Sequence, residues 1–318
     1  MEPYNFKKIE PANLADLVFL VKKVANKRLS VEYYRQKYQT PWAEGQYHGW
    51  LAYDTGSGQV VSVAAALPLC AVLPDGRKMP ATQMIETFTL PEHRGRGLMT
   101  LMVQKILDEH TRNGTHLFFG LLNQNNVHGF VKKLGFTHTG NMAYYQLPVR
   151  TFPLEALCRR CRMPGLFRWW ARKVIAPYRA PTDFVLSNSA QEEGFGGLLH
   201  DARFFKYKSF TFNGLYQFSG ISAWLKLESG LLVGDVVLPK DCPAAQFDAW
   251  LFTLRHIACR AGLKQIVFQA HPQSRLGQQL AARFSPQPSW SVCCLATDEA
   301  LQPFLTKMRF GYGDFETF

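Results

Sequence analysis

The sequence lacks an uninterrupted apolar run long enough to cross a bilayer, which takes about 18 residues. Its longest apolar stretch, residues 60–73, is broken by Ser62 and Pro68 and is typical of a buried strand. The first eight residues contain no apolar signal-peptide core. We therefore expect a cytoplasmic protein.

The arrangement of the cysteines argues against a disulfide framework. The chain has 7 cysteines, an odd number at irregular spacings. Cys158 and Cys161 form the one Cys-x-x-Cys pair, and no second pair follows at a spacing that would complete a zinc site. We therefore expect reduced thiols and no bound metal.

Acidic residues are few, with 24 Asp and Glu against 36 Lys and Arg and a formal net charge of +12. Residues 150–180 hold eight of the basic side chains and a single acid, Glu155. A nucleic-acid-binding protein more often spreads its charge along a whole face, so nucleic acid is not the expected partner. The length of 318 residues and 47% apolar content predict two packed domains.

Hydrophobic periodicity predicts alternating strands and helices in the first half. We expect a strand over residues 4–9, helices over 13–24 and 31–38, and strands over 48–53, 60–73 and 79–90, the three strands joined by turns typical of hairpins. A helix over 98–111, a strand over 116–122, a helix over 127–134 and a closing hairpin around Phe136 and 143–147 follow. A strand, a helix and a second parallel strand form a right-handed crossover.

The second half repeats this crossover pattern at an offset of 148 residues. Six correspondences carry the repeat: Leu90-Pro91 with Leu238-Pro239, Gly114 with Gly262, Phe118-Phe119 with Ile266-Val267, Gly129 with Gly277, Phe136 with Phe284, and helix 98–111 with helix 246–259. We interpret the repeat as an internal duplication; the alternative is a chance alignment of two similar crossovers.

A glycine-rich turn lies between the expected strand and helix at residues 94–99. Glycine permits positive φ and close approach of the backbone, and a helix N-terminus adds open amides and a favourable dipole. Arg94 and Arg96 add positive charge that can meet phosphate oxygens. The turn is suited to a diphosphate. The second copy has Pro239-Lys240-Asp241-Cys242-Pro243 at the equivalent place and lacks the glycines.

Arg94-Gly95-Arg96-Gly97-Leu98-Met99 resembles the Arg/Gln-x-x-Gly-x-Gly/Ala loop of GNAT acyltransferases, with Met99 in place of the final small residue. The flanking Thr89-Leu90-Pro91-Glu92-His93 and the downstream Lys133-Leu134-Gly135-Phe136 also match. The resemblance implies an acyl-CoA-dependent N-acyltransferase, using acetyl-CoA or another acyl-CoA. It further implies a slot between the fourth and fifth strands, with pantetheine along residues 87–90. The expected cofactor-binding residues are Phe88, Thr89, Leu90, Arg94, Gly95, Arg96, Gly97, Leu98, Met99, Asn123 and Asn126.

The same resemblance suggests how the reaction proceeds. Glu86 stands where the family often has a glutamate, and we expect it to act as general base; the alternative is a glutamate paired with a nearby Arg or Lys. An amide near Leu90 would polarise the thioester carbonyl. The tyrosine that many relatives use as acid is replaced by Phe130-Val131, which leaves Tyr144, Tyr145 and His128 as candidates, or an unaided thiolate.

These inferences predict an α/β fold with mixed sheets and two GNAT-like domains, the second degenerate at the cofactor loop. The expected divisions are a catalytic domain at 1–149, a basic aromatic linker helix at 150–180 and an acceptor-binding domain at 181–318. Within the linker, residues 164–178 form a cationic amphipathic stretch. It could lie on an anionic membrane at the inner face or, as the alternative, pack both tryptophans between the domains.

The C-terminal residues 310–318 resemble the Gly-Asp-x-x-Thr-Phe ending of tandem GNAT-like proteins from bacterial polysaccharide loci. That likeness suggests a nucleotide-linked or lipid-linked amino sugar as the amine acceptor; the alternative is a tail that only seals the second domain. Two other functions stay open. One is an aminoacyl-tRNA-dependent transferase like the Fem proteins, and the other is a non-catalytic, membrane-associated binding module.

Overall fold

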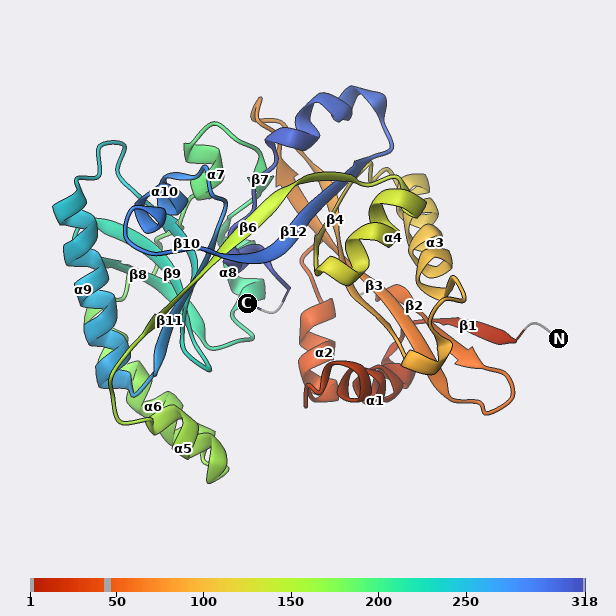
Figure 1. Ribbon diagram of the computed structural model, residues 1–318, viewed down its shortest axis with the longest axis horizontal. Helices are drawn as coiled ribbons and strands as arrows, with labels where there is room; N and C mark the ends of the chain where they lie inside the picture. Colours follow the sequence, from red (N-terminus) through yellow and green to blue (C-terminus); the bar gives the residue numbers. More distant parts are fainter. Residues whose placement is uncertain (1–2, 43–46, 317) are drawn as a thin grey trace. The chain divides into compact units, whose positions relative to one another are not determined.

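The computed structural model describes residues 3–42, 47–316 and 318, which form two compact units (Figure 1). The first unit comprises residues 1–140 and 290–308, and the second comprises 141–289 and 309–318. These divisions differ from the expected domains 1–149 and 181–318. Residues 150–180 belong to the second unit instead of standing between the two.

The first unit is a mixed sheet in the order β1-β2-β3-β4-β5-β12. Its strands are β1 (Tyr4–Lys8), β2 (His48–Asp54), β3 (Val60–Val72), β4 (Lys78–Thr89), β5 (Leu117–Leu122) and β12 (Gln287–Ala296). Strands β4 and β5 pair in parallel, and α3 (Leu98–Arg112) connects them. Two further helices, α1 (Leu14–Ala25) and α2 (Val31–Tyr38), precede β2, and α4 (Gln124–Leu134) follows β5.

Strand β3 is the centre of this unit because eight consecutive residues, from Val60 to Leu67, are buried. Successive residues of a strand point to opposite faces of the sheet, so a strand whose consecutive residues are all buried must be covered on both faces. Helices α1 and α3 both contact it. Three successive alanines, Ala64 to Ala66, leave room for this close packing.

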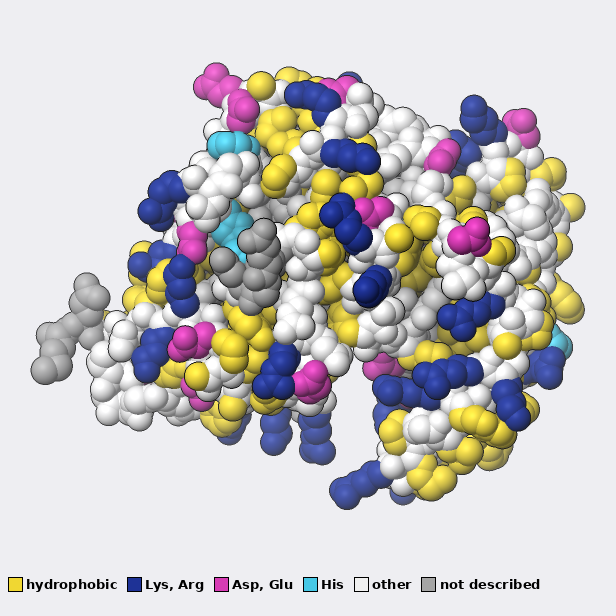
Figure 2. Space-filling model, turned by 180° about the vertical axis from the view of Figure 1, so that it is seen from behind, with side chains coloured by type: hydrophobic (Ala, Val, Ile, Leu, Met, Phe, Trp, Pro, Cys, Tyr) yellow, Lys and Arg dark blue, Asp and Glu magenta, His cyan; other side chains and the backbone are white. Residues whose placement is uncertain are grey.

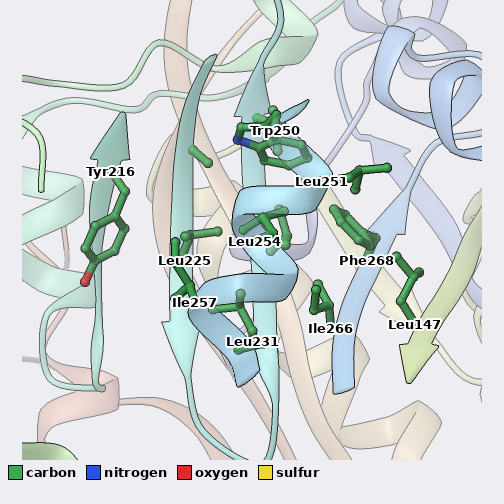
Figure 3. Close-up of a cluster of buried hydrophobic side chains, with 14 of the residues drawn as sticks. Leu147, Tyr216, Leu225, Leu231, Trp250, Leu251, Leu254, Ile257, Ile266 and Phe268 are labelled. Carbon is green, nitrogen blue, oxygen red and sulfur yellow. The ribbon is translucent and has the colours of Figure 1, made fainter. Parts of the chain in front are cut away.

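The second unit is a mixed sheet in the order β6-β11-β10-β9-β8. Its strands are β6 (Thr137–Pro148, of which 141–148 lie here), β8 (Asn213–Phe218), β9 (Ile221–Leu227), β10 (Leu231–Val237) and β11 (Gln265–Ala270). The long helix α9 (Ala244–Ala261) joins the parallel pair β10 and β11. Figure 3 shows its apolar face, with Trp250, Leu254 and Ile257, packed on the sheet.

Shorter elements complete the second unit: α5 (Leu154–Arg160), α6 (Pro164–Ile175), α7 (Ser189–Glu192), β7 (Gly197–Leu198), α8 (Ala202–Lys208) and α10 (Arg275–Ala281). The 3-10 helices of the chain are Pro11–Asn13, Pro91–His93, Ala176–Tyr178, Glu299–Lys307 and Tyr312–Asp314. Among the described helices, none combines the length and hydropathy needed to span a bilayer.

The predicted offset of 148 residues holds at the level of whole elements. Strand β5 at 117–122 and strand β11 at 265–270 coincide at this offset, and β4 and β10 end at equivalent residues, 89 and 237. Strands β6 and β12 also end at equivalent residues, 148 and 296. Each half therefore contains the same succession of strand, helix, parallel strand, helix and strand.

Two expectations about local structure need correction. The closing hairpin expected around Phe136 and 143–147 is one continuous strand, β6, because its pairing partner is the distant strand β11. The basic segment expected as one linker helix is two helices, α5 and α6, separated at Cys161–Met163. Arg162, at a φ of 57°, lies in this break.

Candidate active site

The turn that leads into α3 depends on two glycines. Gly95 and Gly97 both have a φ of 76°, in the left-handed region that side chains other than glycine rarely adopt. A Cβ atom built on either residue would meet nothing within 4 Å. The requirement for glycine therefore comes from the backbone conformation and not from a lack of space.

The amino end of α3 presents open amides at this turn. Gly97 is the N-cap residue and has no side chain with which to cap the helix. The first amides of an α-helix have no partner within the helix, and they carry partial positive charge. Leu98, Met99 and Thr100, which supply these amides, line a groove of about 640 Å³.

The groove is electropositive. The side chains that line it include His93, Arg94, Arg96 and Lys133, and among the described residues no acidic side chain lines it. Its other lining residues are Val24, Ala25, Thr87, Phe88, Thr89, Gly95, Gly97, Leu98, Met99, Thr100, Asn123, Asn125 and Asn126. This combination of amides, cations and small polar side chains suits a polyanionic ligand.

The two arginines of the turn are held differently. Arg96 donates to the Tyr4 hydroxyl at 2.5 Å and to the Glu92 carbonyl at 3.3 Å, which fixes its guanidinium at the rim. Arg94 donates through Nε to the Thr89 carbonyl at 3.2 Å. That single bond orients the Arg94 guanidinium and leaves its terminal nitrogens for a ligand.

Strands β4 and β5 separate beside the groove. Their parallel pairing runs from Ala81 and Leu117 to Met84 and Gly120, while β4 continues to Thr89. At Glu86 the strand has a bulge, with a φ of 48° and a register shift against β3. Asn126 at the start of α4 donates to the Thr87 hydroxyl at 2.9 Å. The end of this pairing at Met84 and Gly120, together with the bulge at Glu86, accounts for the expected slot between the fourth and fifth strands.

The sequence predicts a free strand amide near Leu90 that would polarise the thioester carbonyl. The amide of Leu90 itself is not free, because it donates to the Val61 carbonyl at 2.9 Å. Leu90 is also buried and does not line the groove. Because successive residues of a strand point their amides to opposite sides, the neighbouring Thr89 amide faces away from β3. The Thr89 carbonyl, which accepts from Arg94, points the same way.

Glu86 lies in a buried polar cluster and not on the groove. Its carboxylate is 2.6 Å from the Lys37 ammonium and accepts a hydrogen bond from the Tyr38 hydroxyl at 2.5 Å. The Lys37 and Glu86 side chains are 2% and 5% exposed. The alternative interpretation, a glutamate paired with a nearby basic residue, therefore describes what the structure contains.

The asparagine-rich turn after β5 serves both the fold and the groove. Asn123 is the N-cap of α4 and accepts a hydrogen bond from the Asn126 amide at 3.2 Å. A Cβ atom built on Gly129 would lie only 2.6 Å from the terminal methyl group of Met99. The glycine in α4 thus makes room for the larger residue that ends the loop motif.

None of the predicted proton donors lines the groove. His128 is exposed on α4, and Tyr144 bonds weakly to Gln146 at 3.4 Å. Tyr145 is buried in the second unit, where its hydroxyl is 3.5 Å from the Gly277 carbonyl. Burial raises the pKa of the Tyr145 phenol, which makes it a weaker proton donor. Phe130 is fully buried and packs edge-on against Phe136.

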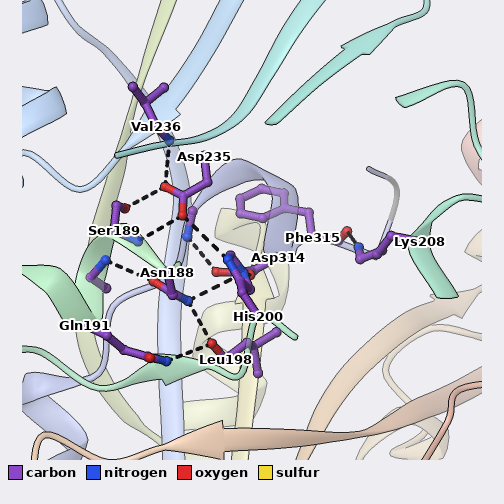
Figure 4. A network of polar contacts seen from close by, with 12 residues as sticks. Asn188, Ser189, Gln191, Leu198, His200, Lys208, Asp235, Val236, Asp314 and Phe315 are labelled. Carbon is purple, nitrogen blue, oxygen red and sulfur yellow. Dashed lines mark hydrogen bonds and ion pairs between the residues drawn. The ribbon is translucent and has the colours of Figure 1, made fainter. Parts of the chain in front are cut away.

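The C-terminal residues pack inside the second unit (Figure 4). Asp314 accepts from His200 at 2.8 Å and from the Gly311 amide at 2.8 Å, and Lys208 donates to the Phe315 carbonyl at 2.6 Å. Asp314 and Phe318 are each 1% exposed. This packing favours the sealing role over an open acceptor site; Thr317 of the predicted motif lies outside the described residues.

Several residues of the site carry no signal that we could interpret in the sequence. Lys37 and Tyr38 sit on a short helix whose polar composition is typical of a solvated helix, yet both are buried against Glu86. Lys133 belongs to the Lys-Leu-Gly-Phe motif, but its place in the groove depends on how α4 returns toward α3. Thr100 lines the groove because the helix begins at Leu98.

Comparison with known proteins agrees with this geometry. Residues 5–137 match the family model described as an acetyltransferase (GNAT) domain. The match covers the glycine-rich turn, the split strands and α4. No curated protein matches the chain in sequence.

Solved structures share the fold along nearly the whole chain. Saccharomyces cerevisiae N-myristoyltransferase with bound myristoyl-CoA aligns with a TM-score of 0.59 at 10% identity, over 93% of this chain and 83% of the yeast chain. A putative acetyltransferase from Pyrococcus horikoshii gives 0.57 at 10%, over 98% and 94%. A GCN5-related N-acetyltransferase from Kribbella flavida gives 0.51 at 12%, over 92% and 71%.

Identities this low establish a similar fold and nothing finer. The match over residues 5–137, less than half of the chain, assigns a GNAT acetyltransferase domain to those residues. The mixed α/β fold is shared with solved N-acyltransferases such as the Kribbella flavida protein.

Proposed function

We propose that the protein transfers an acyl group, acetyl in the first instance, from acyl-CoA to a primary amine in a ternary complex. The observation that carries the proposal is the groove at the amino end of α3, where open amides and basic side chains converge without an acidic neighbour among the described lining residues. A diphosphate is the part of an acyl-CoA that such a site recognises.

We assign the diphosphate to the amides from Gly95 to Thr100, with Arg94 and Lys133 supplying charge. The pantetheine chain would follow Phe88 and Thr89 along the edge of β4 that β5 leaves unpaired. The Thr89 amide, next to Leu90, is our candidate donor to the thioester oxygen. Asn123 and Asn126 keep α4 in place beside this edge.

The reaction forms a bond between the amine nitrogen and the acyl carbon and breaks the bond from that carbon to sulfur. The amine loses one proton, and the leaving thiolate gains one. We propose that Glu86 takes the amine proton, through Tyr38 or a water molecule, because its carboxylate is already hydrogen bonded to the Tyr38 hydroxyl. Lys37 would hold the carboxylate in position.

None of the three sequence-based candidates for the acid lines the groove, and we propose that the thiolate takes its proton from water. A thiolate is a fair leaving group, and we propose that it departs without a protein acid. Tyr144, Tyr145 and His128 were the sequence-based candidates. Buried Tyr145 is the poorest of them, because its hydroxyl is turned to the Gly277 carbonyl.

For the acceptor we propose a primary amine, with an amino sugar of surface polysaccharide synthesis as the first class to test. Support for the sugar comes from the C-terminal sequence alone. We assign acyl-CoA binding to the first unit and acceptor binding to the second, because the turn before α9 contains no residue with positive φ and begins that helix after Pro243.

The test follows thiol release from acetyl-CoA and longer acyl-CoAs in the presence of a panel of amines, together with calorimetric binding. Gly97→Glu should abolish both signals, because it strains the turn and puts a negative charge at the phosphate position. Gly114→Glu is the matched control: Gly114 has a φ of 83° and an equally open surrounding, but it follows α3 outside the groove. Equal losses in both variants would refute the assignment.

A further inference from the structure

Helices α5 and α6 expose an unusual number of large apolar side chains. Leu157, Met163, Leu166 and Trp169 are 39%, 49%, 46% and 52% exposed, and Phe152, just before α5, is 70% exposed. Most apolar side chains of this size are buried in folded proteins. A cluster of five within 18 residues of sequence marks an interaction surface.

The opposite side of α6 is fully used in packing. Phe167, Ala171, Val174 and Ile175 belong to the core of the second unit, and α6 contacts α9. The Trp170 indole donates to the Arg260 carbonyl at 2.8 Å. The interdomain alternative, with both tryptophans packed, therefore fails for Trp169. The apolar side chains of the outer side are not needed to hold the helix in place.

Basic residues surround the exposed apolar side chains. Arg159, Arg160, Arg162, Arg168, Arg172 and Lys173 are all exposed. The one acid in the two helices, Glu155, forms an ion pair with Arg159 at 3.6 Å. Seen from behind, the lobe at the lower right that these helices form is a mixture of Lys and Arg side chains with apolar ones (Figure 2). The Lys173 ammonium lies 4.1 Å from the centre of the Trp169 ring.

We propose that this surface, residues 152–173, docks the protein on an anionic membrane. Tryptophan and leucine enter the interface between headgroups and acyl chains, and arginine and lysine reach back to lipid phosphates. A nucleic acid could bind the arginines through its phosphates. It offers no apolar phase, however, in which the exposed leucine and methionine side chains could be buried. The proposal concerns the second unit and is independent of acyl transfer in the first.

The direct test is binding of the full chain to vesicles of phosphatidylcholine alone and to vesicles of phosphatidylcholine mixed with anionic phosphatidylglycerol. We expect sedimentation with the anionic vesicles only, reversed by high salt. Bromine-labelled lipids should quench the wild-type tryptophan fluorescence, and the quenching should be lost in Trp169→Phe/Leu166→Ser. Unchanged quenching in that variant would overturn the placement.

Phe252→Ser provides the matched apolar control, since Phe252 on α9 is 73% exposed and has few basic neighbours in sequence. It should bind vesicles as the wild type does. Arg168→Gln and Arg172→Gln should each weaken binding about fivefold, close to 1 kcal/mol per basic residue. A failure of the wild type to bind anionic vesicles, or tighter binding to an RNA oligonucleotide than to vesicles, would refute the proposal. Acetyl-CoA binding should be unchanged in all these variants.

Discussion

The Lys37 ammonium lies 2.6 Å from the Glu86 carboxylate, and both side chains are almost completely removed from solvent. Removing one partner of a buried ion pair leaves an uncompensated charge, at a cost of about 3–5 kcal/mol. We therefore expect Glu86→Gln and Lys37→Met each to lower the free energy of unfolding by about this amount, as measured by urea denaturation.

The double variant Lys37→Met/Glu86→Gln removes both charges and should be destabilised by much less than the sum of the two single changes. A double-mutant cycle measures this coupling directly. Strictly additive effects would show that the two groups do not interact in solution.

Glu86 also carries our proposed role in proton transfer. In Glu86→Gln we expect kcat to fall by about two to three orders of magnitude, the usual effect of losing a general base. The KM for acetyl-CoA should stay within about twofold, because Glu86 does not line the groove. Measuring kcat of the double variant as well, whose destabilisation should be well below the sum of the single changes, separates the loss of chemistry from unfolding. A variant with wild-type kcat would remove Glu86 from the mechanism.

Arg94 should contribute to ligand affinity more than Arg96 does, because Arg96 is already bonded to Tyr4 and Glu92. We expect Arg94→Gln to weaken CoA binding about tenfold to hundredfold, as for a charge-assisted hydrogen bond. Arg112→Gln, at the other end of α3 and outside the groove, is the control. Calorimetry at two salt concentrations measures the effect; equal affinity in both variants would contradict it.

Acid should destabilise the first unit through His110. Burial lowers the pKa of this histidine to about 4 from 6.5, and its ring is 2.7 Å from the Thr82 hydroxyl. The folded state holds His110 in its neutral form. The contribution of His110 to the free energy of unfolding is therefore complete above pH 6.5 and is lost as pH falls toward 4. The full loss is about 3 kcal/mol.

Chemical denaturation at pH values of about 7, 6 and 5, which span this titration, measures the loss. The double variant His110→Met/Thr82→Val removes the histidine without leaving the threonine hydroxyl unpartnered, and its stability should depend less on pH over that range. An identical slope in the wild type and the variant would show that another group is responsible.

The sequence predicted most of the sheet because the signals are local or periodic. Ser30, as a predicted N-cap, indicated where α2 begins. In the structure the Ser30 hydroxyl accepts a hydrogen bond from the Tyr33 amide at 3.0 Å. The glycines at 95 and 97 placed the turn, because few other residues tolerate that backbone. The repeat placed α9 to within two residues at each end.

The long-range pairing of the strands could not be predicted from the sequence. No local sequence pattern indicates that β6 pairs with β11 and that β12 pairs with β5. This pairing decides where one unit ends and the other begins. The buried partner of Glu86 lies 49 residues away on a helix of polar composition. The direction of the Leu90 amide depends on its register with β3, and register cannot be read from periodicity alone.

The central claim is that the amides at the amino end of α3 bind the diphosphate of an acyl-CoA. Titration of the protein with CoA and with pantetheine, which lacks the diphosphate and the nucleotide, tests it most directly. We predict that CoA binds at least about a hundredfold more tightly, as two or more charge-assisted hydrogen bonds require. Equal affinity for the two ligands would contradict the account.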